Sequence, residues 1–121
     1  MSYDEDAELT RYVWGHYAHL LSDFEQQVGR AAIGREKAAA SGSPAMFLVL
    51  SERWGRSGDL DIDAALSSGP ESFRRAACRR LLSERGVDVT INRCPQCRRV
   101  VRTPAARQCL WCGHDWHGPA A

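Results

Sequence analysis

Residues 94–112 read CPQCRRVVRTPAARQCLWC, and two closely spaced pairs of cysteines lie within this stretch. Cys94 and Cys97 form the first pair, Cys109 and Cys112 form the second, and eleven residues separate the pairs. Each pair is typical of a tight knuckle that presents two thiolates, and the spacer suffices for a short hairpin that brings the knuckles together. Four thiolates complete the tetrahedral shell that Zn²⁺ prefers. The stretch therefore predicts one structural zinc ion held by these four cysteines.

Residues 87–117 resemble the zinc-ribbon superfamily, whose members present two cysteine knuckles on adjoining short strands. Pro95 inside the first pair and Gly113 after the second match that pattern, whereas Arg98 stands where the superfamily commonly has Gly. The resemblance implies a small β-hairpin module folded around its zinc ion. Residues 1–86 show no resemblance to a known family.

Two other interpretations of the cysteine region stay open. His114 or His117 is close enough in sequence to Cys112 to replace a cysteine as ligand, although four cysteines already close the shell. A redox CxxC pair is the other alternative, but it requires a low-pKa thiol and a thioredoxin-like βαβ context. Otherwise one imidazole is expected to pack or hydrogen-bond near the site, while Trp116, with Trp111, covers its small core.

The first forty residues have the pattern of one long amphipathic helix. Ser2 and Glu5 have capping-box spacing, and three consecutive acids at positions 4–6 suit the positive end of a helix dipole. Apolar residues then recur at intervals of three and four, at Leu9, Val13, Tyr17, Leu20, Phe24, Val28 and Ala31. The pattern predicts a helix to about Ala40, with a possible break after Val28.

A helix from Pro44 to Trp54 is predicted next, with Ser43 as its N-cap. A buried strand is the alternative for its most apolar part, residues 46–50. Three alternating acids then precede Gly69-Pro70, and they are expected to cap a short helical turn that contains Ile62, Ala65 and Leu66. The acids are Asp59, Asp61 and Asp63. A calcium loop is disfavoured because its glycine and closing Glu are missing.

The last predicted helix runs from Pro70 to Arg85 and stops at Gly86. Its apolar arc contains Phe73, Ala77, Cys78, Leu81 and Leu82, so Cys78 is expected to be an inert buried thiol. Val87, Val89 and Ile91 alternate with polar residues, which predicts a strand. The sequence therefore predicts a mainly α fold, with a helical domain over residues 1–86 and a zinc ribbon over residues 87–121.

Composition is that of a soluble globular protein, with 44% apolar and 26% charged residues. Five cysteines form an odd number, and the acidic N-terminus lacks the basic start of an export signal, so metal binding is favoured over a disulfide framework. No apolar run approaches the roughly 20 residues of a membrane span. We expect a cytoplasmic protein without a membrane partner.

Evidence for catalysis in the sequence is weak. His16, His19 and Asp23 would share one edge of the predicted long helix, but a helical metal site also needs ligands from a facing helix. No other His occurs before His114, so surface positions are the simpler interpretation. A phosphate-binding loop and a nucleophile elbow are absent from the sequence. The protein is therefore expected not to be an enzyme.

Charge is unevenly distributed, and it bears on the choice of partner. Residues 1–29 carry six acids and one Arg, whereas residues 73–107 carry ten Arg and two acids. A nucleic-acid surface is one interpretation of the arginines in and beside the spacer, which are Arg93, Arg98, Arg99, Arg102 and Arg107, with Arg75, Arg79 and Arg80 in the preceding helix.

The same arginines can instead offset the charge of the zinc centre, since four thiolates and one Zn²⁺ leave −2. This centre changes the formal charge of the whole chain from +1 to −1, which suits a general nucleic-acid binder poorly. The favoured hypothesis is a non-enzymatic zinc protein that acts by protein contacts or self-association, through apolar surface left on the first helix. Nucleic-acid binding is the alternative, and an unrecognised enzyme or thiol redox protein is a further one.

Overall fold

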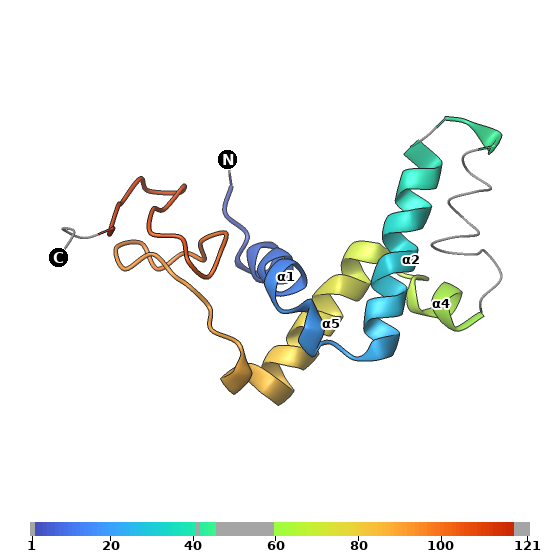
Figure 1. Cartoon of the computed structure of the whole chain (residues 1–121), viewed down its shortest axis with the longest axis horizontal. Coiled ribbons are helices and arrows are strands. Elements are labelled where there is room, and N and C mark those ends of the chain that lie inside the picture. The colour runs from blue at the N-terminus through green and yellow to red at the C-terminus, as the bar shows by residue number, and fades with distance from the viewer. Residues whose placement is uncertain (1, 41, 46–59, 118–121) are drawn as a thin grey trace. The chain divides into compact units, whose positions relative to one another are not determined.

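The computed structural model describes residues 2–40, 42–45 and 60–117, and these are mainly helical (Figure 1). Their helices are α1 (Glu5–His16), α2 (Asp23–Ala40), α4 (Leu60–Ala65) and α5 (Pro70–Arg85), with short 3₁₀ turns η1 (Ala18–Leu20) and η2 (Gly86–Asp88). None of these helices is long and apolar enough to cross a bilayer.

The chain forms two compact units. One contains the residues up to Leu20 and those from Cys78 onward, and the other is Leu21–Ala77. The first unit thus joins α1 to the cysteine region, although they lie far apart in sequence. The predicted boundary between a helical domain and a zinc ribbon near Gly86 is not tested by these units and stays a prediction.

One long N-terminal helix was the wrong prediction, because the helix ends at His16 and a new one starts at Asp23. Ser22 and Glu25 form a capping box that begins α2. The Ser22 N–H donates to Glu25 Oε1 at 2.9 Å, and the Glu25 N–H donates to Ser22 Oγ at 3.1 Å. The break therefore precedes Val28, and Phe24, predicted to be in the apolar stripe, is 44% exposed.

The start of α1 also differs from the prediction. Asp4, not Ser2, is the N-cap, and its carboxylate accepts the N–H of Ala7 at 3.1 Å. Glu5 does not reach back as a capping-box acid, because its carboxylate accepts two hydrogen bonds from the Arg93 guanidinium at 3.1 and 2.6 Å. This bidentate pair lowers the pKa of Glu5, chiefly through the hydrogen bonds from Arg93.

The second unit has its own small core of Val28, Ala31 and Ile62, against which Ala65, Leu66 and Phe73 pack. The predicted turn at Ile62 is α4, and the predicted helix over residues 70–85 is α5 with the same bounds. Ion pairs from Arg35 to Asp63 and from Arg74 to Glu36 link its helices. The helix predicted from Pro44 to Trp54 falls largely outside the described residues.

The strand predicted from Val87 is absent, because η2 continues directly from α5 and leaves Val87 97% exposed. The Val89 N–H closes this turn on the Gly86 carbonyl at 3.2 Å, and only Val89 of the alternating set is buried. Among the described residues β pairing is limited to two isolated antiparallel bridges, Arg93 with Val100 and Gln108 with Asp115. A complete ribbon hairpin thus stays a prediction.

Tyrosine hydroxyls from the N-terminal residues take the place of a pairing strand. Tyr12 is 2% exposed, and its hydroxyl donates to the Thr90 carbonyl at 2.6 Å and accepts the Asn92 N–H at 3.2 Å. The Tyr17 hydroxyl makes longer contacts with both backbone groups of Thr90, at 3.3 and 3.2 Å. The Tyr3 hydroxyl accepts the Val100 N–H at 2.9 Å. All three tyrosines of the chain therefore bind the backbone of residues 90–100.

We predict that Tyr12→Phe lowers the free energy of unfolding by about 1–3 kcal/mol, because it leaves the half-buried N–H of Asn92 without its acceptor. Urea unfolding of the zinc-loaded protein measures this loss. Tyr17→Phe is the matched control, and it should cost less than about 1 kcal/mol because its contacts are long and exposed. A loss for Tyr17→Phe as large as that for Tyr12→Phe would contradict the role given to Tyr12.

Candidate metal centre

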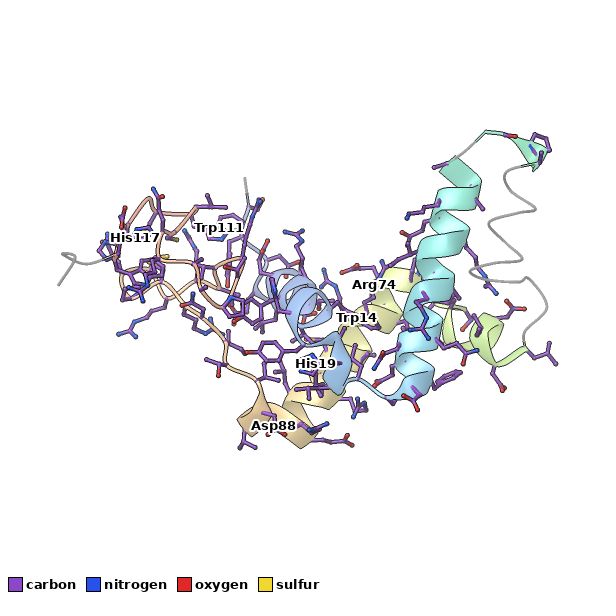
Figure 2. All side chains as sticks on the ribbon, in the orientation of Figure 1. Trp14, His19, Arg74, Asp88, Trp111 and His117 are labelled. Atoms are coloured by element: carbon purple, nitrogen blue, oxygen red, sulfur yellow. The ribbon has the colours of Figure 1, made fainter. Side chains whose placement is uncertain are left out.

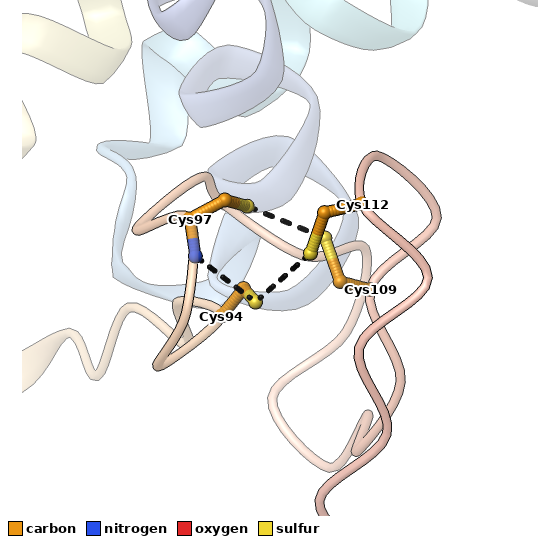
Figure 3. Close-up of side chains that lie close together, drawn as sticks. All are labelled: Cys94, Cys97, Cys109 and Cys112. Carbon is orange, nitrogen blue, oxygen red and sulfur yellow. Dashed lines mark hydrogen bonds between the residues drawn. The ribbon is translucent and has the colours of Figure 1, made fainter.

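Two loops bring the four predicted cysteines together (Figure 3). Cys94 and Cys97 lie on the first loop, and Cys109 and Cys112 lie on the second. The sulfurs of Cys94 and Cys112 are 3.6 Å apart, as are those of Cys97 and Cys109. All four sulfurs lie within 4.8 Å of one another. Each close pair joins one loop to the other, so a bound ion would tie the two loops together.

The two loops have the same backbone hydrogen bonds. In the first, the Arg98 N–H donates to the Cys94 carbonyl at 2.9 Å, and the Cys94 N–H donates to the Arg99 carbonyl at 3.0 Å. In the second, Gly113 and His114 occupy the corresponding positions, with donor–acceptor distances of 2.9 and 2.8 Å to Cys109. The antiparallel bridge follows each loop at the same relative position. Both CxxC pairs therefore form the knuckles that their spacing predicts.

Each knuckle needs a left-handed residue directly after its second cysteine. Gly113 meets this requirement at φ 80° without strain, whereas Arg98 adopts φ 66° and is the only described residue other than glycine with a positive φ. A side chain in this region costs about 1 kcal/mol. The departure from the zinc-ribbon pattern at Arg98 therefore costs some stability but does not prevent the knuckle from forming.

The sulfur positions match the size of a zinc shell. With Zn–S bonds of about 2.3 Å, sulfurs at the corners of a tetrahedron lie about 3.8 Å apart. The two close sulfur pairs, at 3.6 Å, are near this value and too far apart for a disulfide bond of about 2.05 Å. Four soft sulfur donors at this spacing fit Zn²⁺. The geometry supports a metal site, and zinc as its occupant stays a prediction.

Backbone N–H groups point at the knuckle sulfurs. Gln96 and Cys97 both donate to Cys94 Sγ at 3.4 Å, and Trp111 donates to Cys109 Sγ at 3.3 Å. Burial raises the pKa of Cys94, but the backbone N–H groups of Cys97 and Gln96, together with the neighbouring thiols of Cys112 and Cys97, outweigh it and lower the pKa to about 6.

Cys112 has the opposite shift. The N–H of His114 lowers its pKa, whereas desolvation and the neighbouring thiols raise it, to about 11. Four thiols this close do not all ionise by themselves at neutral pH. A divalent cation would displace the remaining protons, so metal binding here should weaken in acid.

A compact core surrounds the sulfurs. Cys94, Val101 and Cys109 are almost fully buried, and Trp111 and Trp116 pack against them together with Cys97 and Ala106. The predicted cover of the core by both tryptophans is therefore confirmed. Asn92 holds the spacer in place, because its side-chain amide donates to the carbonyls of Thr103 and Ala106 at 3.0 and 2.8 Å.

The N-terminal residues add contacts that the sequence analysis did not identify. Tyr3 packs edge to face on Trp111, with ring centroids 5.0 Å apart, and Figure 2 shows Trp111 beside the N-terminal end of the chain. Tyr3 also lies under the guanidinium of Arg99, 5.4 Å from the ring centroid. The sequence signal for these contacts was the acidic and tyrosine-rich composition of residues 3–17. Composition alone does not indicate which other segment of the chain these residues contact.

The other candidate ligands do not join the cluster. His114 stacks on Trp116, and His117 Nδ1 lies 2.6 Å from Asp115 Oδ1. His16 and His19 fall on separate helical segments, α1 and η1, so the shared helix edge predicted for them with Asp23 does not exist. Among the described residues, the four cysteines are the only group of three or more potential ligands within reach of one ion.

Cys78 is buried as predicted, and burial raises the pKa of its thiol. Because the ionised form is disfavoured, it has the character of an inert thiol. It is also absent from the metal-ligand cluster.

Arginines in α5 and in the knuckles have different surroundings. Arg75, Arg79 and Arg80 of α5 pair with Glu71, Asp6 and Glu84, respectively. Around the knuckles, Arg93 alone has a carboxylate partner among the described residues, which is Glu5. Within the described part of the chain, no ion pair with an acid forms at Arg98, Arg99, Arg102 or Arg107.

Fold and site together define a mainly helical protein with a four-cysteine cluster of metal-binding geometry. Comparison of the chain with protein-family models, with curated proteins and with solved structures finds no match. The zinc-ribbon resemblance of residues 87–117 therefore depends on the knuckles alone.

We predict about one zinc ion per chain, measured by native mass spectrometry. Cys94→Ser or Cys112→Ser should abolish stoichiometric zinc, because each removes one corner of the shell. Cys78→Ala is the control, and it should retain the ion. Loss of zinc from Cys78→Ala with the fold intact, or its retention in Cys94→Ser, would overturn the ligand assignment.

Proposed function

We propose that this chain is a non-enzymatic protein in which a structural zinc ion folds the two knuckles and attaches α1 to them, and that it acts by binding another protein. The main support for this proposal is that the sulfurs of the four cysteines lie within 4.8 Å of one another. A four-thiolate shell leaves no open coordination position for a substrate, which supports a structural role.

Contacts between the N-terminal residues and the knuckle region would let the ion order α1 as well as the knuckles. Glu5 pairs with Arg93, and the Tyr3 hydroxyl accepts the N–H of Val100. The Tyr12 hydroxyl bonds to the backbone of Thr90 and Asn92. These partners are held in position by loops that have little secondary structure of their own. Zinc is therefore required both to fold the knuckles and to hold α1 in position. Together the knuckles and α1 form one ordered surface for a partner protein.

Chelation under reducing conditions tests the structural role. Hydrogen exchange should lose protection in residues 90–116 and in α1 together, because α1 packs on a segment too small to fold unaided. Protection in α2 should persist, because α2 belongs to the other compact unit. Circular dichroism should then show a partial loss of helicity. Retained protection in α1 would contradict the proposal, as would loss of protection throughout α2.

Nucleic-acid binding is the second candidate, and one observation favours it. Arg98, Arg99, Arg102 and Arg107 are exposed and make no ion pair with an acid of the described chain. The arginines of α5 add less, because Arg75, Arg79 and Arg80 already pair with carboxylates. Both tryptophans of the knuckles also have ring partners, Tyr3 for Trp111 and His114 for Trp116, which leaves less surface for stacking of bases.

Salt dependence separates the two candidates. We predict that single-stranded and duplex probes bind weakly and are released by physiological salt, since the −2 charge of a zinc–thiolate centre would offset much of the charge of the knuckle arginines. Fluorescence anisotropy across a salt series measures this. A module that uses four or five arginines would show a logarithmic slope of about −0.9 per phosphate on duplex DNA. Sub-micromolar binding at physiological salt, lost in the triple variant Arg98→Ala, Arg99→Ala, Arg102→Ala with zinc retained, would refute protein binding as the leading function.

A further inference from the structure

The second knuckle presents a large apolar side chain to solvent. Leu110 lies between Cys109 and Trp111 and is 66% exposed. Its backbone is held by the knuckle hydrogen bonds on either side, from Cys109 to His114 and from Gly113 to Cys109. Exposure of a leucine is ordinary by itself. Leu110 differs from a mobile surface leucine because its position is set by two cysteines of the cluster.

Beside Leu110 lies a small cavity, which we call the knuckle cavity. Its volume is about 200 Å³. Its wall is largely apolar and is formed by Val101, Arg102, Ala106, Gln108, Leu110 and Trp111. Val101, Ala106 and Trp111 also belong to the core around the sulfurs, so the wall is anchored to the metal cluster. Pockets for drug-sized ligands measure about 300–1,000 Å³, so this cavity suits one apolar side chain better than a whole small molecule.

The region that contains the knuckle cavity carries net positive charge. Residues 93–117 contain five arginines and one carboxylate, Asp115, which lies against His117. When the charge of Glu5 and the −2 of a zinc–thiolate centre are added to that of residues 93–117, the net charge of the region is +1. Arg102 is exposed and lines the cavity itself. An apolar cavity with one arginine in its wall, in a region of net positive charge, is complementary to a segment that carries acids around an apolar residue.

We propose that the knuckle cavity binds one apolar side chain of an acidic segment in a partner protein, with Arg102 pairing with a flanking carboxylate. The proposal rests on the proposed function of protein binding and names the surface and the chemistry of the partner. A nucleic acid fits this cavity less well. Its wall offers little polar surface for phosphate, and Trp111 is already in contact with Tyr3.

Selection from a displayed library of random peptides tests the proposal. Zinc-loaded full-length protein should enrich peptides in which at least two Asp or Glu residues flank one Leu, Ile, Phe or Trp. Isothermal titration with a selected peptide should then show at least tenfold weaker binding for Leu110→Ser and for Arg102→Glu. Val87→Ser is the matched control, because Val87 is an exposed apolar residue of the same compact unit outside the cavity, and its affinity should be unchanged.

Zinc content of every variant is measured in parallel, which separates failure of the site from failure of the proposed function. If wild-type protein lacks zinc, the proposed function fails and the knuckle cavity proposal fails with it. With zinc present, peptides that lack acids, or affinities unchanged by Leu110→Ser, would overturn the cavity proposal while leaving protein binding in place. Enrichment of no peptide would also overturn it, as would binding of a twelve-residue oligothymidine at physiological salt that depends on Leu110 and Arg102.

Discussion

Four sulfurs brought within 4.8 Å of one another impose the constraint on which the cysteine region depends. The segment around them has two isolated β bridges and a core of a few side chains, chiefly Val101 and two tryptophans. A core of this size does not offset the conformational entropy of ordering some twenty-five residues, and chains this short usually need a metal or disulfides. The pKa of Cys94 lies below the ordinary thiol value and that of Cys112 lies above it, because the two thiols are hydrogen-bonded and the proton is retained on Cys112.

The knuckle region also depends on α1 for hydrogen bonds that a larger sheet would supply. An extended backbone with unpaired N–H and carbonyl groups is costly to bury. Here Tyr12 satisfies both Thr90 and Asn92, and Tyr3 satisfies Val100. Side chains of α1 and of Tyr3 before it thus replace the neighbouring strand. This arrangement connects the N-terminal helix to the four-cysteine cluster, although more than seventy residues separate them in sequence.

Electrostatics divides the arginines into two groups with different consequences. In α5 the guanidiniums lie within reach of carboxylates and so contribute to the fold, each by a modest amount because the pairs are largely exposed. Around the knuckles Arg98, Arg102 and Arg107 have no such partner in the described chain. The acidic partner proposed above depends on this positive charge and on the largely apolar cavity that Arg102 lines.

The sequence by itself determined the two knuckles and the helices α4 and α5. Two CxxC pairs are local patterns whose backbone geometry is set within six residues, and α5 is bounded by Pro70 and Gly86, which are strong local signals. Ser22 and Glu25 carried an equally local signal for the start of α2, but the regular apolar spacing across residues 9–31 concealed it. Only the tertiary structure decided the conformation of residues 87–92. Their alternation fits a strand, yet a strand needs a partner, and Tyr12 of α1 together with Tyr17 directly after it provides the hydrogen bonds instead. The contact between Tyr12 and Thr90 joins residues 78 positions apart in sequence and leaves no periodic trace in either segment.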